Sequence, residues 1–471
     1  MGCKTSLGAD GLTGMNITAR RPLLFPTSEA YDAALEIVRS LRRDGHVTYF
    51  VGGCVRDALL GQPVKDYDVA TSAPPRRVEE LFRHTKAVGE AFGVMLVVHR
   101  GIPFEVATFR SESGYANRRH PSQVEFSSPE EDVKRRDFTI NGLFFDPESG
   151  EVIDYVGGLT DLDARRLRTI GNPDERFGED ALRLMRAVRF ATSYGLTLEE
   201  STRESLCRNS SHIRHISAER IGEEWERGLM RADPHRFLGL MLESGLAAET
   251  LPELAEASRY SVVGRAVVEC TARRLEFIAR GGSSLDADQR VIARWAGLFF
   301  ELGRPQAAPR RLDQGLWLGE SMMMAAAELW REAARRLAQG NRVRDRVTWT
   351  LERACEWQNF DQLARWRQRE LLGEPDAAID RCLLEAYSAV HHTSPLPLQA
   401  AVELEQQLLA AGQPPLPPPL ITGRDLLRAG WPAGPAMGAR LAQVRRAQLD
   451  GRLNTPEEAL TFAGLPTGRA S

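Results

Sequence analysis

The sequence lacks the features that mark membrane proteins and exported, disulfide-bonded proteins. No apolar run approaches the length needed to cross a bilayer, and no apolar signal segment follows the first residues. Six cysteines are scattered along the chain without a Cys-x-x-Cys pair. This argues against a zinc site and a disulfide framework, and fits a reducing compartment. We therefore expect a cytoplasmic protein that does not associate with membranes.

A strong excess of charge is also lacking. The chain of 471 residues has 61 Lys and Arg against 64 Asp and Glu, which leaves a net charge of −3. The total charge therefore gives no signal for nucleic acid, and an RNA-binding surface must come from local arginine clusters. The length predicts two to four domains, and the 42% of hydrophobic residues is typical of a globular protein.

A glycine pair near the N-terminus is the first feature that suggests a function. Gly52 and Gly53 separate a predicted strand over residues 47–51 from a short predicted helix over residues 55–60. The pair is consistent with a plain strand-to-helix turn. It also suits a phosphate, because the free N–H groups at a helix start bind anions, glycine allows close approach, and Arg56 adds a positive charge.

Three acidic residues follow this turn. Asp66 and Asp68 belong to a predicted strand over residues 66–71, which would place both side chains on one face. Glu105 interrupts an otherwise apolar predicted strand over residues 103–110, where acids are usually paired or bound to a metal. One interpretation is a solvated strand end. The other is a carboxylate cradle for two Mg²⁺ ions in phosphoryl or nucleotidyl transfer.

Two arginine-containing blocks come later in the chain. Arg136 precedes an apolar segment and lies either in a charged surface turn or against a phosphate. Four charged residues then recur every three positions in a predicted helix over residues 179–194, so they form one stripe on its surface. The stripe is either a solvated face with internal salt bridges or a binding surface. Its members are Asp180, Arg183, Arg186 and Arg189.

Five blocks, in this order and spacing, resemble the class II nucleotidyltransferases, which include bacterial CCA-adding tRNA nucleotidyltransferases and poly(A) polymerases. They are Gly-Gly-Cys-Val-Arg-Asp with Asp-Tyr-Asp, Glu-Val-Ala-Thr-Phe-Arg, Arg-Arg-Asp-Phe-Thr-Ile-Asn, Asp-Tyr-Val-Gly-Gly, and Glu-Asp-Ala-Leu-Arg-Leu-Met-Arg-Ala-Val-Arg-Phe. The resemblance spans residues 45–250, and residues 217–221 resemble a later motif of the family's neck.

The resemblance and the chain's patterning together imply an α+β protein. We expect an N-terminal nucleotidyltransferase head with a mixed β-sheet, followed by an all-helical neck, body and tail. The expected divisions are a disordered extension over residues 1–26, the head over 27–165, a neck with the base-reading helix over 166–262, a tRNA-binding body over 263–412, and a proline linker with a helical tail over 413–471.

The resemblance also implies roles for individual residues. Asp66 and Asp68 are expected to bind Mg²⁺, with Glu105 as the third catalytic carboxylate. Nucleotide-binding positions are Gly52, Gly53, Arg56 and Arg136, together with the stripe. The implied reaction is attack by the 3′-hydroxyl of tRNA on the α-phosphate of ATP or CTP, with tRNA held by its acceptor arm and 3′ end.

Asp180 and Arg183 match the family's base-reading positions, and their chemistry explains the choice of base. Cytosine and adenine both present an exocyclic amine beside a ring nitrogen acceptor. A carboxylate accepts a hydrogen bond from the amine, and a guanidinium donates one to the ring nitrogen. Uracil and guanine present the opposite order, which leaves polar groups unpaired.

Other functions on the same scaffold stay open at this stage. A poly(A) polymerase or A-adding enzyme fits the head motifs, and a catalytically silent RNA-binding relative fits the fold. Many relatives carry a His-Asp phosphohydrolase motif downstream, but this chain has Phe300 and Glu301 in a similar context, so we expect no phosphohydrolase activity.

His391 is expected in a loop. Residues 110–121 are expected to form a mobile loop, and arginines between residues 331 and 369 lie either on solvated helix faces or against tRNA phosphates.

Overall fold

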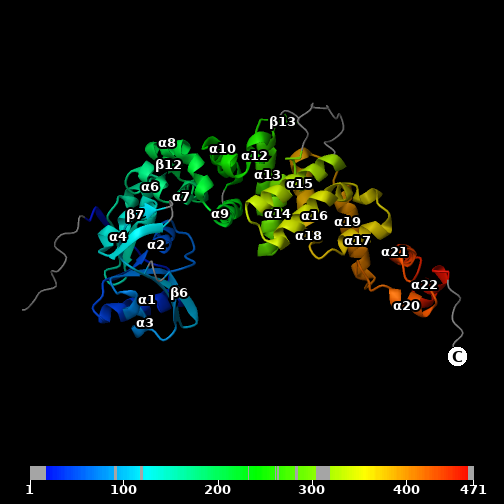
Figure 1. Ribbon diagram of the computed structural model, residues 1–471, viewed down its shortest axis with the longest axis horizontal. Coiled ribbons are helices and arrows are strands. Elements are labelled where there is room, and N and C mark those ends of the chain that lie inside the picture. Colours follow the sequence, from blue (N-terminus) through cyan, green and yellow to red (C-terminus); the bar gives the residue numbers. More distant parts are fainter. Residues whose placement is uncertain are drawn as a thin grey trace, which may run out of the picture. The chain divides into compact units, whose positions relative to one another are not determined.

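The structure is a computed structural model, and its chain divides into two compact units (Figure 1). Unit 1 comprises residues 1–228 and 239–250, and unit 2 comprises residues 229–238 and 251–471. The described residues are 17–89, 93–116, 120–231, 233–259, 261–262, 265–281, 285–303 and 319–464. The expected α+β architecture is confirmed, since a mixed sheet in unit 1 is followed by helices.

Unit 1 is built on an eight-stranded sheet with the order β1-β10-β9-β2-β3-β6-β5-β4. Neighbouring strands run antiparallel except for β3 and β6, which are parallel. The strands are β1 (Ala19–Pro22), β2 (Thr48–Val51), β3 (Asp68–Thr71), β4 (Thr85–Gly89), β5 (Val94–His99), β6 (Ile102–Thr108), β9 (Leu143–Asp146) and β10 (Glu151–Asp154).

The beginning of the described chain belongs to this sheet. Residues 17–26 are therefore not part of a disordered extension, because β1 pairs with β10 and Phe25 is buried against Phe145 with ring centres 4.4 Å apart. Backbone pairing and one buried aromatic ring hold a segment whose composition alone suggests a tail. The rest of the expected extension, residues 1–16, lies outside the described residues.

Helix α1 (Glu29–Arg43) covers one face of the sheet and forms where its apolar spacing predicts. The Ser28 hydroxyl accepts a hydrogen bond from the backbone N–H of Tyr31 and so caps its N-terminus. The remaining helices of unit 1 are α2 (Gly53–Leu59), α3 (Pro75–Leu81), α4 (Pro129–Lys134), α5 (Gly158–Asp163), α6 (Pro173–Glu179), α7 (Leu182–Ser193), α8 (Glu200–Asn209) and α11 (Leu246–Thr250), while α9 (Ala218–Arg231) and α10 (Pro234–Glu243) contribute to both units.

Short paired strands complete unit 1 and begin unit 2. β7 (Arg110–Ala116) and β8 (His120–Phe126) form an antiparallel hairpin, so the loop expected over residues 110–121 is wrong for the described part; residues 117–119 lie outside it. The other pairs are β11 (Arg166–Leu167) with β12 (Thr197–Leu198), and β13 (Ser261–Val262) with β14 (Arg265–Ala266).

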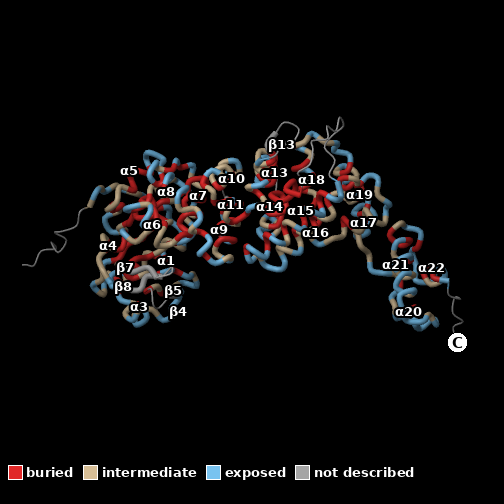
Figure 2. Tube along the Cα trace, turned by 45° about the horizontal axis from the view of Figure 1, so that its top comes forward, coloured by how far each residue is buried: buried red, intermediate tan, exposed pale blue. Residues whose placement is uncertain are grey.

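Unit 2 is helical, and its interior is filled by large aromatic side chains. Trp295, Trp330 and Trp357 are almost completely buried, and the tube in Figure 2 shows buried residues running through these helices. The helices are α12 (Pro252–Ala257), α13 (Val267–Gly281), α14 (Ala287–Phe299), α15 (Glu320–Arg336), α16 (Asn341–Gln358), α17 (Arg365–Leu372), α18 (Ala377–His391), α19 (Leu396–Ala410), α20 (Gly423–Arg428), α21 (Pro435–Leu449) and α22 (Pro456–Phe462).

The proline-rich segment between α19 and α20 contains no helix, as its composition predicts. Arg369 donates hydrogen bonds to the carbonyls of Pro414 and Pro415, which fastens the segment to α17. The helices beyond it share a small core that includes Leu426 and Val444. Within the described ranges, none of the helices combines the length and apolarity needed to cross a membrane.

Candidate nucleotidyl-transfer site

Strand register brings Asp68 and Glu105 together. Val69 of β3 lies opposite Val106 of β6 in a parallel pair, so the preceding residues, Asp68 and Glu105, are neighbours on the other face of the sheet. Val51 of β2 lies opposite Asp68 and shares that face. Two of the three expected carboxylates therefore lie side by side on adjacent strands.

Asp66 reaches the same cluster from a loop rather than from a strand. β3 begins at Asp68, so the expectation that a strand holds Asp66 and Asp68 on one face is wrong. The three acids are nevertheless close in electrostatic terms. Burial, followed by the charges of Glu105 and Asp66, raises the pKa of Asp68 to about 6, although Arg136 and Arg56 act in the opposite direction.

This donor set suits a hard divalent cation. All three side chains offer carboxylate oxygens, the ligands that Mg²⁺ prefers. The raised pKa of Asp68 shows that the nearby arginines do not fully offset the burial of this carboxyl and its repulsion by Glu105 and Asp66. A bound cation would relieve that repulsion. Asp66 and Asp68 can therefore hold Mg²⁺, with Glu105 beside them.

The glycine pair forms the predicted turn between β2 and α2. Gly52 has φ +70°, a conformation that residues with a side chain rarely adopt. A Cβ atom there would also stand 3.3 Å from Nη1 of Arg136 and 3.8 Å from the carbonyl oxygen of Asn141. Glycine is thus required for both the backbone conformation and the close approach of Arg136.

Arg56 is buried in a network instead of pointing toward solvent. Its Nη1 donates to Oδ1 of Asn141 at 2.5 Å, and its Nη2 donates to the Tyr194 hydroxyl at 2.5 Å and to Oδ1 of Asp57 at 2.7 Å. The guanidinium also lies 4.2 Å from the centre of the Tyr194 ring. Arg56 therefore ties α2 to the segment after Phe138 and to the end of α7, and its contact with phosphate stays a prediction.

Arg136 lies beside the glycine turn and near Asp68 of the acid cluster. Its guanidinium bonds the buried carboxylate of Asp132 at 3.0 Å and points Nη1 at the carbonyl oxygen of Asn141, 3.4 Å away. The positive charge of Arg136 opposes the rise in the pKa of Asp68, which means that the two groups are near one another. Sequence reasoning overlooked Asp132 and Asn141, although Asn141 closes the Arg-Arg-Asp-Phe-Thr-Ile-Asn block.

The helix expected over residues 179–194 is broken at Asp180. α6 ends at Glu179 and α7 begins at Leu182, while Asp180 has extended φ and ψ angles of −140° and 103°. Its Oδ1 accepts a hydrogen bond from the backbone N–H of Leu182 at 3.1 Å. This side-chain-to-backbone bond forms a turn just before α7, whose N-cap residue is Ala181, and the three-residue charge spacing cannot reveal it.

The two proposed base-reading side chains have different partners. Asp180 pairs with Arg220 of α9 at 2.9 Å, whereas Arg183 bonds Glu179 at 2.6 Å and donates to the carbonyl of Arg135 at 2.9 Å. Arg220 was missed as a functional residue; its only signal was its place in the segment that resembles the neck motif. Glu179 was missed too.

The rest of the stripe consists of buried or half-buried salt bridges and is not a solvated face. Arg186 bonds Asp137 at 2.6 Å, and Arg189 bonds the buried Glu224 of α9 at 2.6 Å. Burial by itself would raise the pKa of Asp137, but Arg186 and the hydrogen bond from Asn141 outweigh it and lower the value to about 2. These two arginines hold α7 in place, and direct nucleotide contact by either stays a prediction.

Glu301, whose sequence context is similar to that expected for the His-Asp motif, is fully buried in unit 2. It pairs with Arg274 of α13 at 2.7 Å and with His391 at 2.7 Å. His391 is therefore the half-buried last residue of α18 and not a loop residue. Cys270 completes the one group of three possible metal ligands within 4.8 Å found among the described residues, but Arg274 already supplies a positive charge to Glu301.

Most arginines of the helical region have acidic partners. Arg331 bonds Glu352, Arg336 bonds Glu253 at 2.6 Å, and the remaining pairs are Arg342 with Asp288, Arg346 with Asp380, and Arg367 with Glu356. These contacts favour salt-bridged helix faces over free phosphate contacts for most of the set. Arg365 is exposed, and no acidic partner is found for it within the described ranges.

Comparison with known proteins extends these observations over the whole chain. Residues 48–168 match the family "Poly A polymerase head domain", and residues 195–258 match "Probable RNA and SrmB- binding site of polymerase A". A CCA-adding enzyme from Geobacillus kaustophilus is 32% identical over 432 residues, which is 91% of this chain and 95% of that relative. This chain belongs to the CCA-adding enzyme family.

Two other relatives of the family show how similarity is distributed. A CCA-adding enzyme from Anoxybacillus flavithermus is 43% identical over 254 residues, which is 52% of this chain and 64% of that relative. The crystal structure of the Bacillus stearothermophilus CCA-adding enzyme in complex with CTP matches with a TM-score of 0.68 and 29% identity, and covers 93% of this chain and 98% of that one. Similarity to the family therefore extends well beyond the head motifs.

Proposed function

We propose that this protein is a template-independent tRNA nucleotidyltransferase that adds C, C and A to tRNA 3′ ends. The substrates are CTP, ATP and the 3′ end of tRNA held by its acceptor arm, and the product released is pyrophosphate. The observation that carries the proposal is the 32% identity to a CCA-adding enzyme over 432 residues, because it spans head and helical regions alike. The acid cluster beside the glycine turn supplies the chemistry.

In the proposed reaction, the acids of the head bind the metal ions, and the glycine turn and Arg136 bind the triphosphate. Asp66 and Asp68 would hold Mg²⁺ ions, with Glu105 as a third carboxylate, and the bound ions would supply charge neutralisation and a lower pKa for the attacking hydroxyl. Gly52, Gly53 and Arg136 receive the triphosphate, because the glycine turn leaves room beside a guanidinium. The 3′-oxygen then bonds to the α-phosphorus, and the bond to the bridging oxygen breaks.

Base selection is assigned to Asp180 and Arg183. A carboxylate that accepts from an exocyclic amine and a guanidinium that donates to a ring nitrogen would fit cytosine and adenine alike. The carboxylate of Asp180 has spare acceptor capacity beside Arg220 and Leu182. The reaction would take place in the cytoplasm, in keeping with free cysteines such as Cys54 and Cys270.

The decisive experiment measures nucleotide incorporation into defined tRNA ends. Labelled CTP and ATP are offered to tRNA lacking its CCA end and to tRNA ending in CC. We expect two C and one A on the first substrate and one A on the second. ATP incorporation without CTP incorporation would identify an A-adding enzyme, and long A tracts would identify a poly(A) polymerase.

Variants of the acid cluster test the mechanism itself. Asp66→Ala and Asp68→Ala are expected to lower incorporation by several orders of magnitude while the fold is retained, since the metal ligands are lost. Asp163→Ala is a matched control, because Asp163 is an exposed acid of unit 1 that bonds Arg21 and is assigned to neither the metal nor the nucleotide. Wild-type incorporation by both cluster variants would rule out this site.

A further inference from the structure

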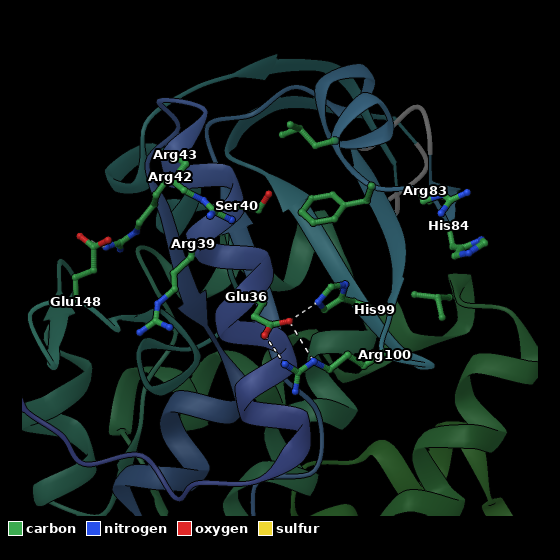
Figure 3. A pocket seen from close by; sticks show the side chains of 13 residues that line it. Glu36, Arg39, Ser40, Arg42, Arg43, Arg83, His84, His99, Arg100 and Glu148 are labelled. Atoms are coloured by element: carbon green, nitrogen blue, oxygen red, sulfur yellow. Dashed lines mark hydrogen bonds and ion pairs between the residues drawn. The ribbon is translucent and has the colours of Figure 1, made fainter.

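The head carries a concave surface lined by residues other than the acid cluster, a cavity of about 920 Å³ (Figure 3). It is formed by the second half of α1, the segment that follows α3, and the hairpin between β5 and β6. Its lining includes five arginines and two histidines against two glutamates. The chain as a whole has a net charge of −3, so this positive excess is a local feature.

The cavity and the acid cluster lie on opposite faces of the sheet. Glu105 of β6 is opposite Leu96 of β5, and side chains alternate along a strand, so His99 faces away from Glu105. The ring nitrogen of His99 bonds Glu36 of α1 at 2.7 Å, as Figure 3 shows. Phosphates of a nucleotide at Asp68 and Glu105 are therefore on the other side of the sheet from this cavity.

Both acids in the lining already have cationic partners. Glu36 bonds His99 and Arg100, and Glu148 bonds Arg42 at 3.0 Å. Arg42 is further engaged by Asp146 at 2.8 Å. These two glutamates therefore provide no negative charge to pair with the other positively charged side chains of the cavity.

The uncompensated cations are Arg39, Arg43 and Arg83, with His84 beside them. All four are exposed, and within the described ranges none has an acidic side chain within salt-bridge distance. Guanidinium groups gathered on one concave surface repel one another, and a ligand with several negative charges removes that repulsion. Phosphate suits them best, because the planar guanidinium bonds two phosphate oxygens at once.

We propose that this cavity binds chains of phosphate groups, the chemistry that an RNA backbone and a free oligophosphate share. Its volume admits more than a single phosphate. Apolar atoms of Leu81 and Phe82 form part of the wall. The proposal does not rest on nucleotide addition, because the cavity and the acid cluster are on different faces.

The test uses the full-length protein with three substitutions, Arg39→Gln, Arg43→Gln and Arg83→Gln. A matched control carries lysine at the same three positions, which keeps the charge. Calorimetry in EDTA measures the affinity for tripolyphosphate, and fluorescence anisotropy over a salt series measures the affinity for tRNA lacking CCA. We expect the affinity of the glutamine variant for at least one ligand to fall by about tenfold or more, and the affinity of the lysine control to fall much less.

The two arms identify the source of the phosphates. If the cavity holds RNA, the slope of log affinity against log salt for tRNA falls by about two to three in the glutamine variant. If it holds a free oligophosphate, only the affinity for tripolyphosphate falls. Affinities equal to wild type for both ligands would overturn the proposal.

Two further measurements distinguish a failure of this proposal from misfolding of the variant and from a failure of the proposed function. Arg39→Glu, a single exposed substitution on α1, repeats the test if the triple variant does not fold. Incorporation of CTP and ATP at saturating tRNA is expected at the wild-type level in every variant. A protein without incorporation but with charge-dependent phosphate binding would therefore retain this site and lose only the proposed function.

Discussion

The carboxylate of Asp180 pairs with the guanidinium of Arg220 at 2.9 Å and not with Arg183, its expected partner in base reading. Arg220 lies 40 positions further along the chain, on α9, so helix α9 orients the residue proposed to select the base. A carboxylate has acceptor sites for about four hydrogen bonds, which leaves room for an exocyclic amine beside Arg220.

Replacing Asp180 by alanine is expected to relax base selection. The acceptor for the amine of cytosine and adenine disappears, and a pair of this kind is worth about 1–3 kcal/mol of discrimination. Steady-state kcat/KM for CTP and ATP against UTP and GTP should therefore converge by about tenfold or more. The dependence of the rate on Mg²⁺ concentration should stay as in the wild type, because Asp180 is not a metal ligand.

Arg220→Gln serves as the comparison for this variant. It removes the group that orients Asp180 but leaves the carboxylate, so discrimination should weaken less than in Asp180→Ala. Unchanged discrimination against UTP and GTP in Asp180→Ala would exclude Asp180 from base selection.

Gly52→Ala is expected to impair nucleotide binding in addition to stability. The backbone there has φ +70° and ψ −122°, outside the regions that residues with a side chain favour, and the new methyl group would press on Arg136. Gly61→Ala is the matched control, because Gly61 has φ +65° with nothing within 4 Å of the added Cβ. Both variants should lose stability in urea unfolding, but only Gly52→Ala should show a large rise in KM for CTP. Equal KM values would mean that Arg136 does not contact the triphosphate.

The salt bridge between Asp137 and Arg186 predicts a specific loss of stability in acid. Because the pKa of Asp137 is lowered to about 2 in the folded protein, its stabilisation is fully present above the unfolded value near 4 and is lost as the pH falls toward 2. The difference in free energy of unfolding between wild type and Asp137→Asn should shrink by about 2 kcal/mol across this window. Urea unfolding followed by circular dichroism at each pH measures it.

Asp163→Asn is the control for this pH series. Asp163 is exposed and its pKa is lowered by its bond to Arg21, so its substitution should change stability far less. A difference between wild type and Asp137→Asn that stays constant from pH 6 to pH 2 would contradict the assignment.

Glu301→Gln is expected to destabilise unit 2 by about 3–5 kcal/mol, since it leaves the buried Arg274 without its counter-charge. The double variant Arg274→Met/Glu301→Leu should regain most of that loss, because it removes both charges together. Tryptophan fluorescence during urea unfolding reports on this unit through Trp295 and Trp330. A single variant as stable as the wild type would show that the pair does not support the core.

Local sequence is sufficient to predict those elements whose structure depends on residues close together in the chain. The apolar spacing of residues 28–43 specifies α1, and the glycine pair specifies the turn after β2. An acid in an otherwise apolar strand draws attention to Glu105, although the structure leaves this residue exposed on β6 beside Asp68. The five motif blocks point to a nucleotidyltransferase, and the comparisons confirm the family.

The tertiary structure determines burial and side-chain pairing between residues that are far apart in the chain. No local pattern shows that Arg56 is enclosed by Asn141 and Tyr194, or that Asp180 pairs with Arg220. In sequence the charge stripe is compatible with a solvated face or a binding surface, yet Arg189 is buried where it meets Glu224 of α9. Periodicity describes one helix surface at a time, whereas burial and charge pairing depend on which other element covers that surface.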